Sequence, residues 1–190
     1  HFLVGCINEI GQKQKADNVS GLLGESSLSA YVEQFEDGLP DGFFLRIGID
    51  DFRDINGDFG MEYGDYILKC IAENIKPSQR LYRILADEFM VVDFSGGDME
   101  AATELYKNIR KSLDTFIEEN GYKSVFTISA GAVDTAKTSG TYENIMKLSE
   151  YALNTAKDQG KNRCYIYMQE DYDVFLRKKQ ITRQLHHAVN

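Results

Sequence analysis

The segment Arg83–Phe89 constrains the fold of this chain more than any other stretch. Residues that favour strands flank it on both sides, Leu81-Tyr82 before it and Met90–Phe94 after it. Two such runs separated by a few small or acidic residues predict a β-hairpin with Asp87 and Glu88 at its tip. Adjacent carboxylates repel each other unless a cation or a hydrogen-bond donor compensates. The tip is therefore a candidate site.

A second acidic strand end lies upstream of the hairpin. Phe43–Ile49 is predicted to be a strand, and Asp50 and Asp51 follow it directly. If this strand and the hairpin share a sheet, their carboxylates converge at one end of it. Oxygen ligands grouped in this way hold Mg²⁺ over phosphates.

The rest of the chain alternates between helical and strand periodicity. Periodicity predicts further helices at 2–16, 27–34, 62–75, 99–120, 141–157 and 171–190, and strands at 123–133 and 164–167. Ser27 is the expected cap of the second helix, and the last helix is expected to turn Val174, Ile181, Leu185 and Val189 inward. A strand–helix–hairpin–helix–strand kernel predicts an α+β fold, with a mainly antiparallel sheet and helices packed on it in a ferredoxin-like layout.

Composition limits the function classes. With 190 residues and 43% hydrophobic residues, the chain can form one domain with a core. The expected division is an entry helix or linker at 1–16, the main domain at 17–168 and a helical linker toward a further domain at 169–190. The net charge of −9 argues against nucleic-acid binding. The sequence contains no apolar run long enough to span a bilayer, so we expect no membrane contact by this segment. Three scattered cysteines without metal-ligand spacing predict reduced thiols and a cytoplasmic location.

Five segments in a fixed order resemble the GGDEF domain, the family of diguanylate cyclases, which join two GTP molecules into cyclic di-GMP. The resemblance runs from Asp17 to Tyr167 and implies a fold like the palm of nucleotidyl cyclases. The matching segments are Asp17–Leu22 (family D-x-L-T-G-L), Ile49–Asn56 with Gly60 and Gly64-Asp65 (I-D-x-F-K-x-I-N…G…G-D), Leu85–Phe89 (G-G-D/E-E-F), Ser129–Gly131 (S-A-G) and Ala156–Arg163 (A-K-x-x-G-R-N-R).

The resemblance implies a site for GTP. Asn56 and Asp65 stand at the positions that read guanine, because an amide and a carboxylate pair with the edges of the base. Arg53, Lys157 and Lys161 stand where the triphosphate is bound, and their charge suits it.

The resemblance also implies a place for Mg²⁺ and for the chemistry. Backbone N–H groups around Asp51 and Phe52 are expected to help hold phosphate. Asp87 and Ile49 stand at metal-binding positions. Glu88 stands at the position associated with activating the attacking 3′-hydroxyl.

Several positions depart from the family pattern. The second metal carboxylate of the family falls on Gly48, which has no side-chain ligand. The two glycines of the signature are Leu85 and Ala86, whose side chains are expected to crowd the nucleotide. The R-x-x-D motif of the product-inhibition site falls on Lys76 and Gln79, which predicts that this site is absent.

Two further departures occur. Gly57 and Met61 replace the family's Asp and His in the loop after the first strand, and Gly24-Glu25 replaces Asn-Arg in the opening motif. Simpler interpretations also stand beside the resemblance. The acidic residues after the first strand are also typical of a solvated loop, and Asp87-Glu88 of a polar turn. Lys157 and Lys161 are also typical of cations near a helix C-terminus.

Three functions therefore remain. The favoured one is a catalytically inactive domain that binds GTP or a partner and regulates a neighbour, which the last helix suggests is an EAL phosphodiesterase domain. The second is a working cyclase with an altered metal site. The third is a scaffold for dimerisation. A homodimer is compatible with all three.

Overall fold

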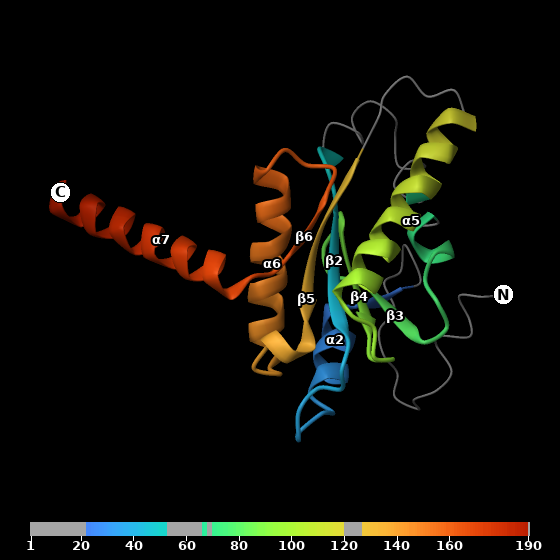
Figure 1. Cartoon of the computed structure of the whole chain (residues 1–190), viewed down its shortest axis with the longest axis horizontal. Coiled ribbons are helices and arrows are strands. Elements are labelled where there is room, and N and C mark those ends of the chain that lie inside the picture. Colours follow the sequence, from blue (N-terminus) through green and yellow to red (C-terminus); the bar gives the residue numbers. More distant parts are fainter. Residues whose placement is uncertain (1–21, 53–65, 68–69, 120–126, 190) are drawn as a thin grey trace.

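The computed structural model describes residues 22–52, 66–67, 70–119 and 127–189. The predicted entry helix at 2–16, residues 62–65 and 68–69 of the predicted helix at 62–75, and residues 123–126 of the predicted strand at 123–133 lie outside the described residues. Figure 1 shows a central sheet with helices on both faces. This arrangement confirms the expected α+β fold.

The described strands form one six-stranded sheet in the order β1-β3-β4-β2-β5-β6. Their bounds are β1 (Leu23–Gly24), β2 (Phe43–Ile49), β3 (Gln79–Arg83), β4 (Glu88–Asp93), β5 (Ile128–Asp134) and β6 (Cys164–Ile166). The three inner pairings are antiparallel, and the pairings of β1 with β3 and of β5 with β6 at the edges are parallel. The sheet is thus mainly antiparallel, as the sequence predicts. All seven residues of β2 are buried, because β2 lies at the centre with helices over both of its faces.

Alternating side chains of β2 pack against different helices. Phe43, Leu45, Ile47 and Ile49 share a core cluster with the buried face of α5 (Met99–Glu119). Phe44 faces the other way, toward α2 (Glu25–Val32) and α6 (Tyr142–Asp158). Strand alternation therefore places Arg46 and Gly48 on the same face as α6.

The helix bounds agree with the predictions within a few residues, with two corrections at the N-terminal side. Helix α2 begins at Glu25, its N-cap is Gly24 without a side-chain cap bond, and Ser27 is buried inside the helix. Ser27 is therefore not the cap. The sequence predicts no strand between the helices at 2–16 and 27–34, but β1 lies there and pairs with β3. Thr141 does cap α6, since its hydroxyl accepts a hydrogen bond from the Asn144 N–H.

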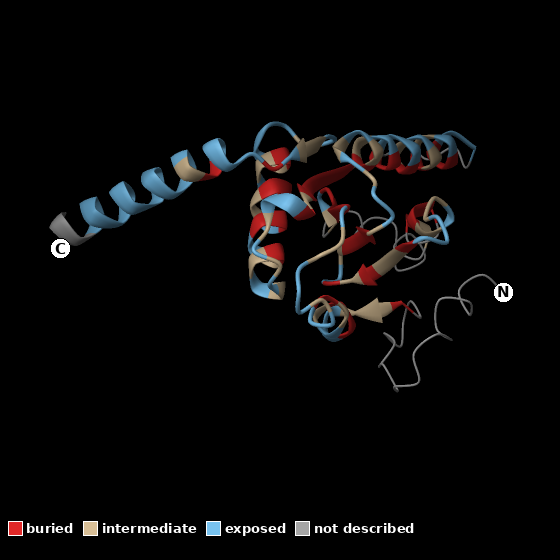
Figure 2. Cartoon of the chain, turned by 60° about the horizontal axis from the view of Figure 1, so that its bottom comes forward, coloured by how far each residue is buried: buried red, intermediate tan, exposed pale blue. Residues whose placement is uncertain are grey.

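The last helix, α7 (Gln169–Val189), projects away from the sheet (Figures 1 and 2). Tyr172 is buried against Tyr151, with ring centroids 4.8 Å apart. The next turns lose this contact: Ile181 is 57% exposed and Leu185 is 62% exposed. The prediction that Val174, Ile181 and Leu185 face inward is wrong for this chain, because only the first turns of α7 reach the α6 face. The side chain of Val189 lies outside what is described.

Two further findings bear on the sequence predictions. Cys70 is buried, and burial raises the pKa of the Cys164 thiol to about 12, which keeps that thiol protonated. Among the residues that the structure describes, no helix is long and apolar enough to cross a membrane.

Candidate functional site

A pocket of about 370 Å³ lies where β2 ends, beside the hairpin that joins β3 to β4. The backbone N–H of Ile49 donates to the carbonyl of Asp87 at 3.0 Å, which ties the two strand ends together. The described residues that line the pocket are Ile49, Asp50, Asp51, Phe52, Asp87, Lys157 and Lys161. The structure thus brings together five of the predicted site residues. Arg53, Asn56 and Asp65 lie outside the described residues.

Asp50 ties three segments together at the base of the pocket. It is 3% exposed. Its carboxylate accepts hydrogen bonds from the Thr127 hydroxyl at 2.6 Å, the Ser129 hydroxyl at 2.8 Å and the Asn162 N–H at 3.2 Å. Buried carboxylates need such donors, because desolvation without them is costly. Asp50 therefore holds the end of β2 against β5 and the segment after α6.

Asp51 and Lys161 form a bridge across the pocket. The Lys161 ammonium lies 2.7 and 2.9 Å from the two oxygens of Asp51, and both side chains are about half exposed. Asp51, Lys161 and Asn162 all have a positive φ, near 50–60°. Such backbone conformations are uncommon outside glycine and collect at functional sites. An exposed pair of this kind contributes only about 0–1 kcal/mol, so an anionic ligand can compete for Lys161.

Glu88 is paired with a buried arginine. The Nε and Nη2 atoms of Arg46 each lie 2.7 Å from Oε2 of Glu88, and the two side chains are 6% and 13% exposed. The Nη1 of Arg46 donates to the carbonyl of Met146 in α6. Lys157 approaches the other carboxylate oxygen, with Nζ 3.9 Å from Oε1. The sequence prediction missed Arg46, although a single charge inside the apolar strand Phe43–Ile49 was a usable signal.

Two glycines set the position of α6 over the sheet. A Cβ on Gly131 would overlap the backbone nitrogen of Leu153, so α6 packs directly on the backbone of β5. A Cβ on Gly48 would lie 3.0 Å from Nζ of Lys157. Lys157 therefore reaches the site because α6 lies close to the sheet and because residue 48 has no side chain.

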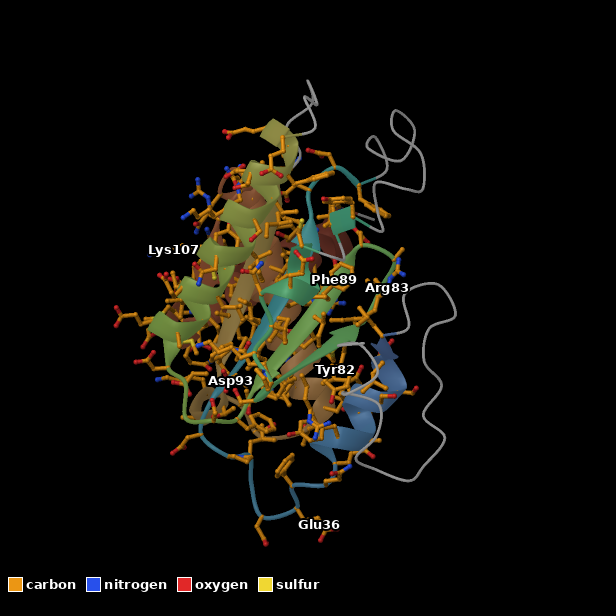
Figure 3. All side chains as sticks on the ribbon, turned by 90° about the vertical axis from the view of Figure 1, so that its right-hand side faces the viewer. Glu36, Tyr82, Arg83, Phe89, Asp93 and Lys107 are labelled. Atoms are coloured by element: carbon orange, nitrogen blue, oxygen red, sulfur yellow. The ribbon has the colours of Figure 1, made fainter. Side chains whose placement is uncertain are left out.

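The tip of the hairpin leaves the pocket open. Leu85 is 52% exposed, and neither Leu85 nor Ala86 is among the described residues that line the pocket. The carbonyl of Ala86 accepts a hydrogen bond from Arg83 at 2.7 Å. Arg83 and Phe89 lie at this end of β3 and β4, as Figure 3 shows. Leu85 and Ala86 are both exposed, and crowding of a nucleotide by their side chains stays a prediction.

The opposite end of the hairpin, marked by Asp93 in Figure 3, carries a separate polar network. Gln79 donates to Asp93 at 2.8 Å and accepts from the backbone N–H of Lys76 at 2.9 Å. Burial tends to raise the pKa of Asp93, but hydrogen bonds from Ser95 and Gln79 outweigh it and hold the pKa below its ordinary value of 3.8. Gln79 is thus engaged within the protein at both ends of its amide.

The described residues do not fit a resident metal ion. They contain no group of three or more His, Cys, Asp or Glu side chains that could hold one. Gly48 offers no carboxylate, and Glu88 is bound to Arg46. Asp87 lines the pocket, and Ile49 can offer only its backbone carbonyl.

Comparisons with known proteins agree on the family. Residues 23–163 match a family profile described as diguanylate cyclase, GGDEF domain. Diguanylate cyclase DgcP of Pseudomonas aeruginosa is 33% identical over 113 residues, which are 54% of this chain and 16% of that protein. The chain therefore spans about one sixth of this curated relative.

Solved structures show the same fold. The isolated GGDEF domain of YfiN (TpbB) from Pseudomonas aeruginosa superposes with a TM-score of 0.71 at 18% identity, covering 85% of this chain and 99% of that one. The active GGEEF domain of a diguanylate cyclase from Vibrio cholerae superposes with a TM-score of 0.61 at 27% identity, covering 76% of this chain and 94% of that one.

Proposed function

This chain belongs to the GGDEF family of diguanylate cyclase domains, and on that premise we propose that it is a catalytically inactive member that binds GTP and regulates a neighbouring domain. GGDEF domains act in cyclic di-GMP signalling and generally use GTP and Mg²⁺. The observation that carries the proposal is the composition of the pocket. It keeps Lys157 and Lys161, whereas the family's metal carboxylate is replaced by Gly48.

The missing carboxylate at Gly48 affects phosphoryl transfer more than it affects the binding of GTP. Catalysis of phosphoryl transfer is nearly all positioning and charge neutralisation. A site without the carboxylate at Gly48 lacks one anchor for the metal ion that would do this. The lysines, in contrast, are sufficient as point charges for a triphosphate. A site that retains recognition without chemistry suits a sensor, because a ligand shifts an equilibrium through its different affinity for two states.

Binding would rearrange the pocket in one specific way. The phosphates would compete with Asp51 for Lys161, because the Lys161 ammonium lies 2.7 Å from an oxygen of Asp51. Asp87 lines the same pocket, so the lysines must offset its charge as well as that of the nucleotide. The family positions Asn56, Asp65 and Arg53 would read the base and support the phosphates.

Calorimetric titration with GTP, with and without Mg²⁺, tests the proposal. We expect GTP to bind and to raise the melting temperature, and Asp65→Ala to weaken binding about tenfold or more, because a lost partner of a buried polar group costs about 1–3 kcal/mol. Lys157→Ala should weaken binding as well. Lys107→Ala is the matched control, since Lys107, labelled in Figure 3, is an exposed lysine of α5 that is not among the residues lining the pocket. If millimolar GTP gives neither heat nor a melting shift, nucleotide binding is refuted and a scaffold role remains.

An active cyclase is the second candidate. Asp87 lines the pocket, so one carboxylate of the hairpin still faces the place where a metal-bound triphosphate would lie. The fold shared with the active domain from Vibrio cholerae is compatible with this alternative. Measuring cyclic di-GMP made from GTP separates the two candidates.

We also propose a cytoplasmic location and a neighbouring EAL phosphodiesterase domain as the regulated partner. The exposed apolar residues of α7, among them Ile181 and Leu185, support a partner at this helix. A homodimer would be an additional arrangement, and light scattering of the purified protein would test it.

A further inference from the structure

We propose that Arg46 and Lys157 take the place of the divalent cation at this site, so that two basic side chains neutralise Glu88 and exclude a metal ion. The inference goes beyond the proposed function, because it concerns the protein without nucleotide. It rests on three features: the buried pair of Arg46 and Glu88, the position of Lys157 and the absence of a side chain at Gly48.

The first feature is the direction in which Arg46 points. In the sheet, Arg46 lies between Met90 of β4 and Gly131 of β5. It faces α6, and its guanidinium reaches Glu88, which is one pleat further along β4. A guanidinium stays charged under all conditions a protein meets. A charge with 6% exposure needs a partner, so Glu88 is held as the anion of a buried pair.

The second feature is that both oxygens of Glu88 face a cation. Arg46 binds Oε2 with two nitrogen atoms, and Lys157 lies 3.9 Å from Oε1. The carboxylate of Glu88 thus meets two positive charges, one on the buried Arg46 and one on the partly exposed Lys157. A divalent cation brought to Glu88 would be repelled by both side chains, and the repulsion is stronger here than in water.

The third feature links the lost ligand to the new cation. Nζ and Cε of Lys157 would lie 3.0 and 3.2 Å from a Cβ on residue 48. The glycine that removes the family's carboxylate therefore also makes room for the ammonium. A carboxylate restored at position 48 would meet Lys157 first, and the two would pair with each other. Restoring the ligand alone should consequently not restore a metal site.

Titration of the nucleotide-free protein with Mn²⁺ tests this inference, with binding measured by calorimetry and by water proton relaxation. Four proteins are compared: wild type, Gly48→Asp, Gly48→Asp/Arg46→Leu/Lys157→Met, and the last with Glu88→Gln added. We expect the wild type and Gly48→Asp to bind Mn²⁺ weakly and alike. The triple variant should bind at least about tenfold tighter, because both repelling cations are gone. Adding Glu88→Gln should abolish the gain.

Two results would overturn the inference. One is tight Mn²⁺ binding by the wild type that Glu88→Gln, made as a single variant for this comparison, removes. The other is Gly48→Asp alone binding Mn²⁺ as tightly as the triple variant. Lys107→Met in the Gly48→Asp background is the control for Lys157→Met, because each removes one positive charge and Lys107 is at an exposed position of α5.

Loss of folding is checked by thermal melting of each variant. If the triple variant does not melt cooperatively, Gly48→Asp/Lys157→Met decides, because Lys157 is 26% exposed and its removal leaves the pair of Arg46 and Glu88 intact. This variant should bind Mn²⁺ tighter than Gly48→Asp, and equal affinity would refute the role of Lys157. Failure of the wild type to bind GTP would refute the proposed function and would leave these metal titrations unaffected.

Discussion

Two adjacent aspartates at the end of β2 have opposite surroundings. Asp50 is buried and accepts hydrogen bonds from Thr127, Ser129 and Asn162, whereas Asp51 is exposed and pairs with Lys161. Asp50→Ala should lower the free energy of unfolding by about 1–3 kcal/mol, because it leaves buried donors unpaired. Asp51→Ala should lower it by less than about 1 kcal/mol, as expected for an exposed ion pair. Urea unfolding of the two variants measures both, and equal losses would contradict this account of Asp50.

The Asp93 network predicts how stability depends on pH. The pKa of Asp93 is below its ordinary value in the folded protein, since burial raises it but the bonds from Ser95 and Gln79 outweigh burial. A lowered folded pKa stabilises the protein above the unfolded pKa of about 3.9, and this stability is lost as pH falls through the folded value. Gln79→Ala should therefore reduce stability at pH 6 and make it less sensitive to pH below about 4. Urea unfolding from pH 6 down through the range below about pH 4 measures the change, and an unchanged slope below about pH 4 would argue against the network.

The same glutamine bears on product inhibition. Gln79 is a neutral amide whose oxygen and nitrogen are hydrogen-bonded to the Lys76 N–H and to Asp93, so it does not supply the carboxylate of an R-x-x-D motif. We predict no tight binding of cyclic di-GMP beside the hairpin. Calorimetry with cyclic di-GMP checks this, and tight binding that Lys76→Ala abolishes would show the prediction to be wrong.

The contact of α6 with the sheet depends on glycine at one point. An added Cβ at Gly131 would overlap backbone atoms of Ala152 and Leu153, whereas one at Gly48 would meet the ends of the Lys157 and Leu153 side chains at 3.0–3.2 Å. Backbone cannot yield as flexible side chains can. Gly131→Ala should thus destabilise the protein by about 1–3 kcal/mol and Gly48→Ala by clearly less. Thermal and urea unfolding compare the two, and the reverse order would contradict this account of the packing.

Helix α7 has one anchored end. Tyr172 is 6% exposed because it packs against the rings of Tyr151 and Tyr167, whereas Leu185 on the same helix is 62% exposed. Tyr172→Ala should cost about 3 kcal/mol, as for other buried aromatic residues. Leu185→Ala should change stability by no more than about 0.5 kcal/mol. A large loss from Leu185→Ala in urea unfolding would mean that the outer part of α7 is covered in solution.

At the scale of the whole molecule, the proposal predicts that no cyclic di-GMP is made at a useful rate. Gly48 removes a metal ligand and Arg46 holds Glu88, so positioning and charge neutralisation both fail. Concentrated protein is incubated with GTP and Mg²⁺ or Mn²⁺, and the product is quantified chromatographically. Steady production that Asp87→Ala abolishes would favour the active cyclase instead.

Local patterns were sufficient to predict most elements of the fold. The periodicities of α5, α6, β2 and the hairpin depend on residues a few positions apart, and these elements were found with bounds close to the observed ones. Strand β1 is not predicted from the sequence, because its two residues are too few to show a period and only their pairing with β3 defines the strand. The face of α7 was misjudged for a related reason: an apolar stripe indicates that something covers it but not what.

The sequence by itself determined the family, the order of the elements and the meeting of two acidic strand ends, because these follow from motifs and from hydrophobic period. Only the tertiary structure decided which charges neutralise which. Arg46 and Glu88 are 42 residues apart in the chain, and their pairing arises because β2 and β4 are neighbours in register. Lys157 joins them because α6 lies on Gly131 and because Gly48 leaves the space. Charge pairing depends on distance and burial, which residue identity alone does not contain.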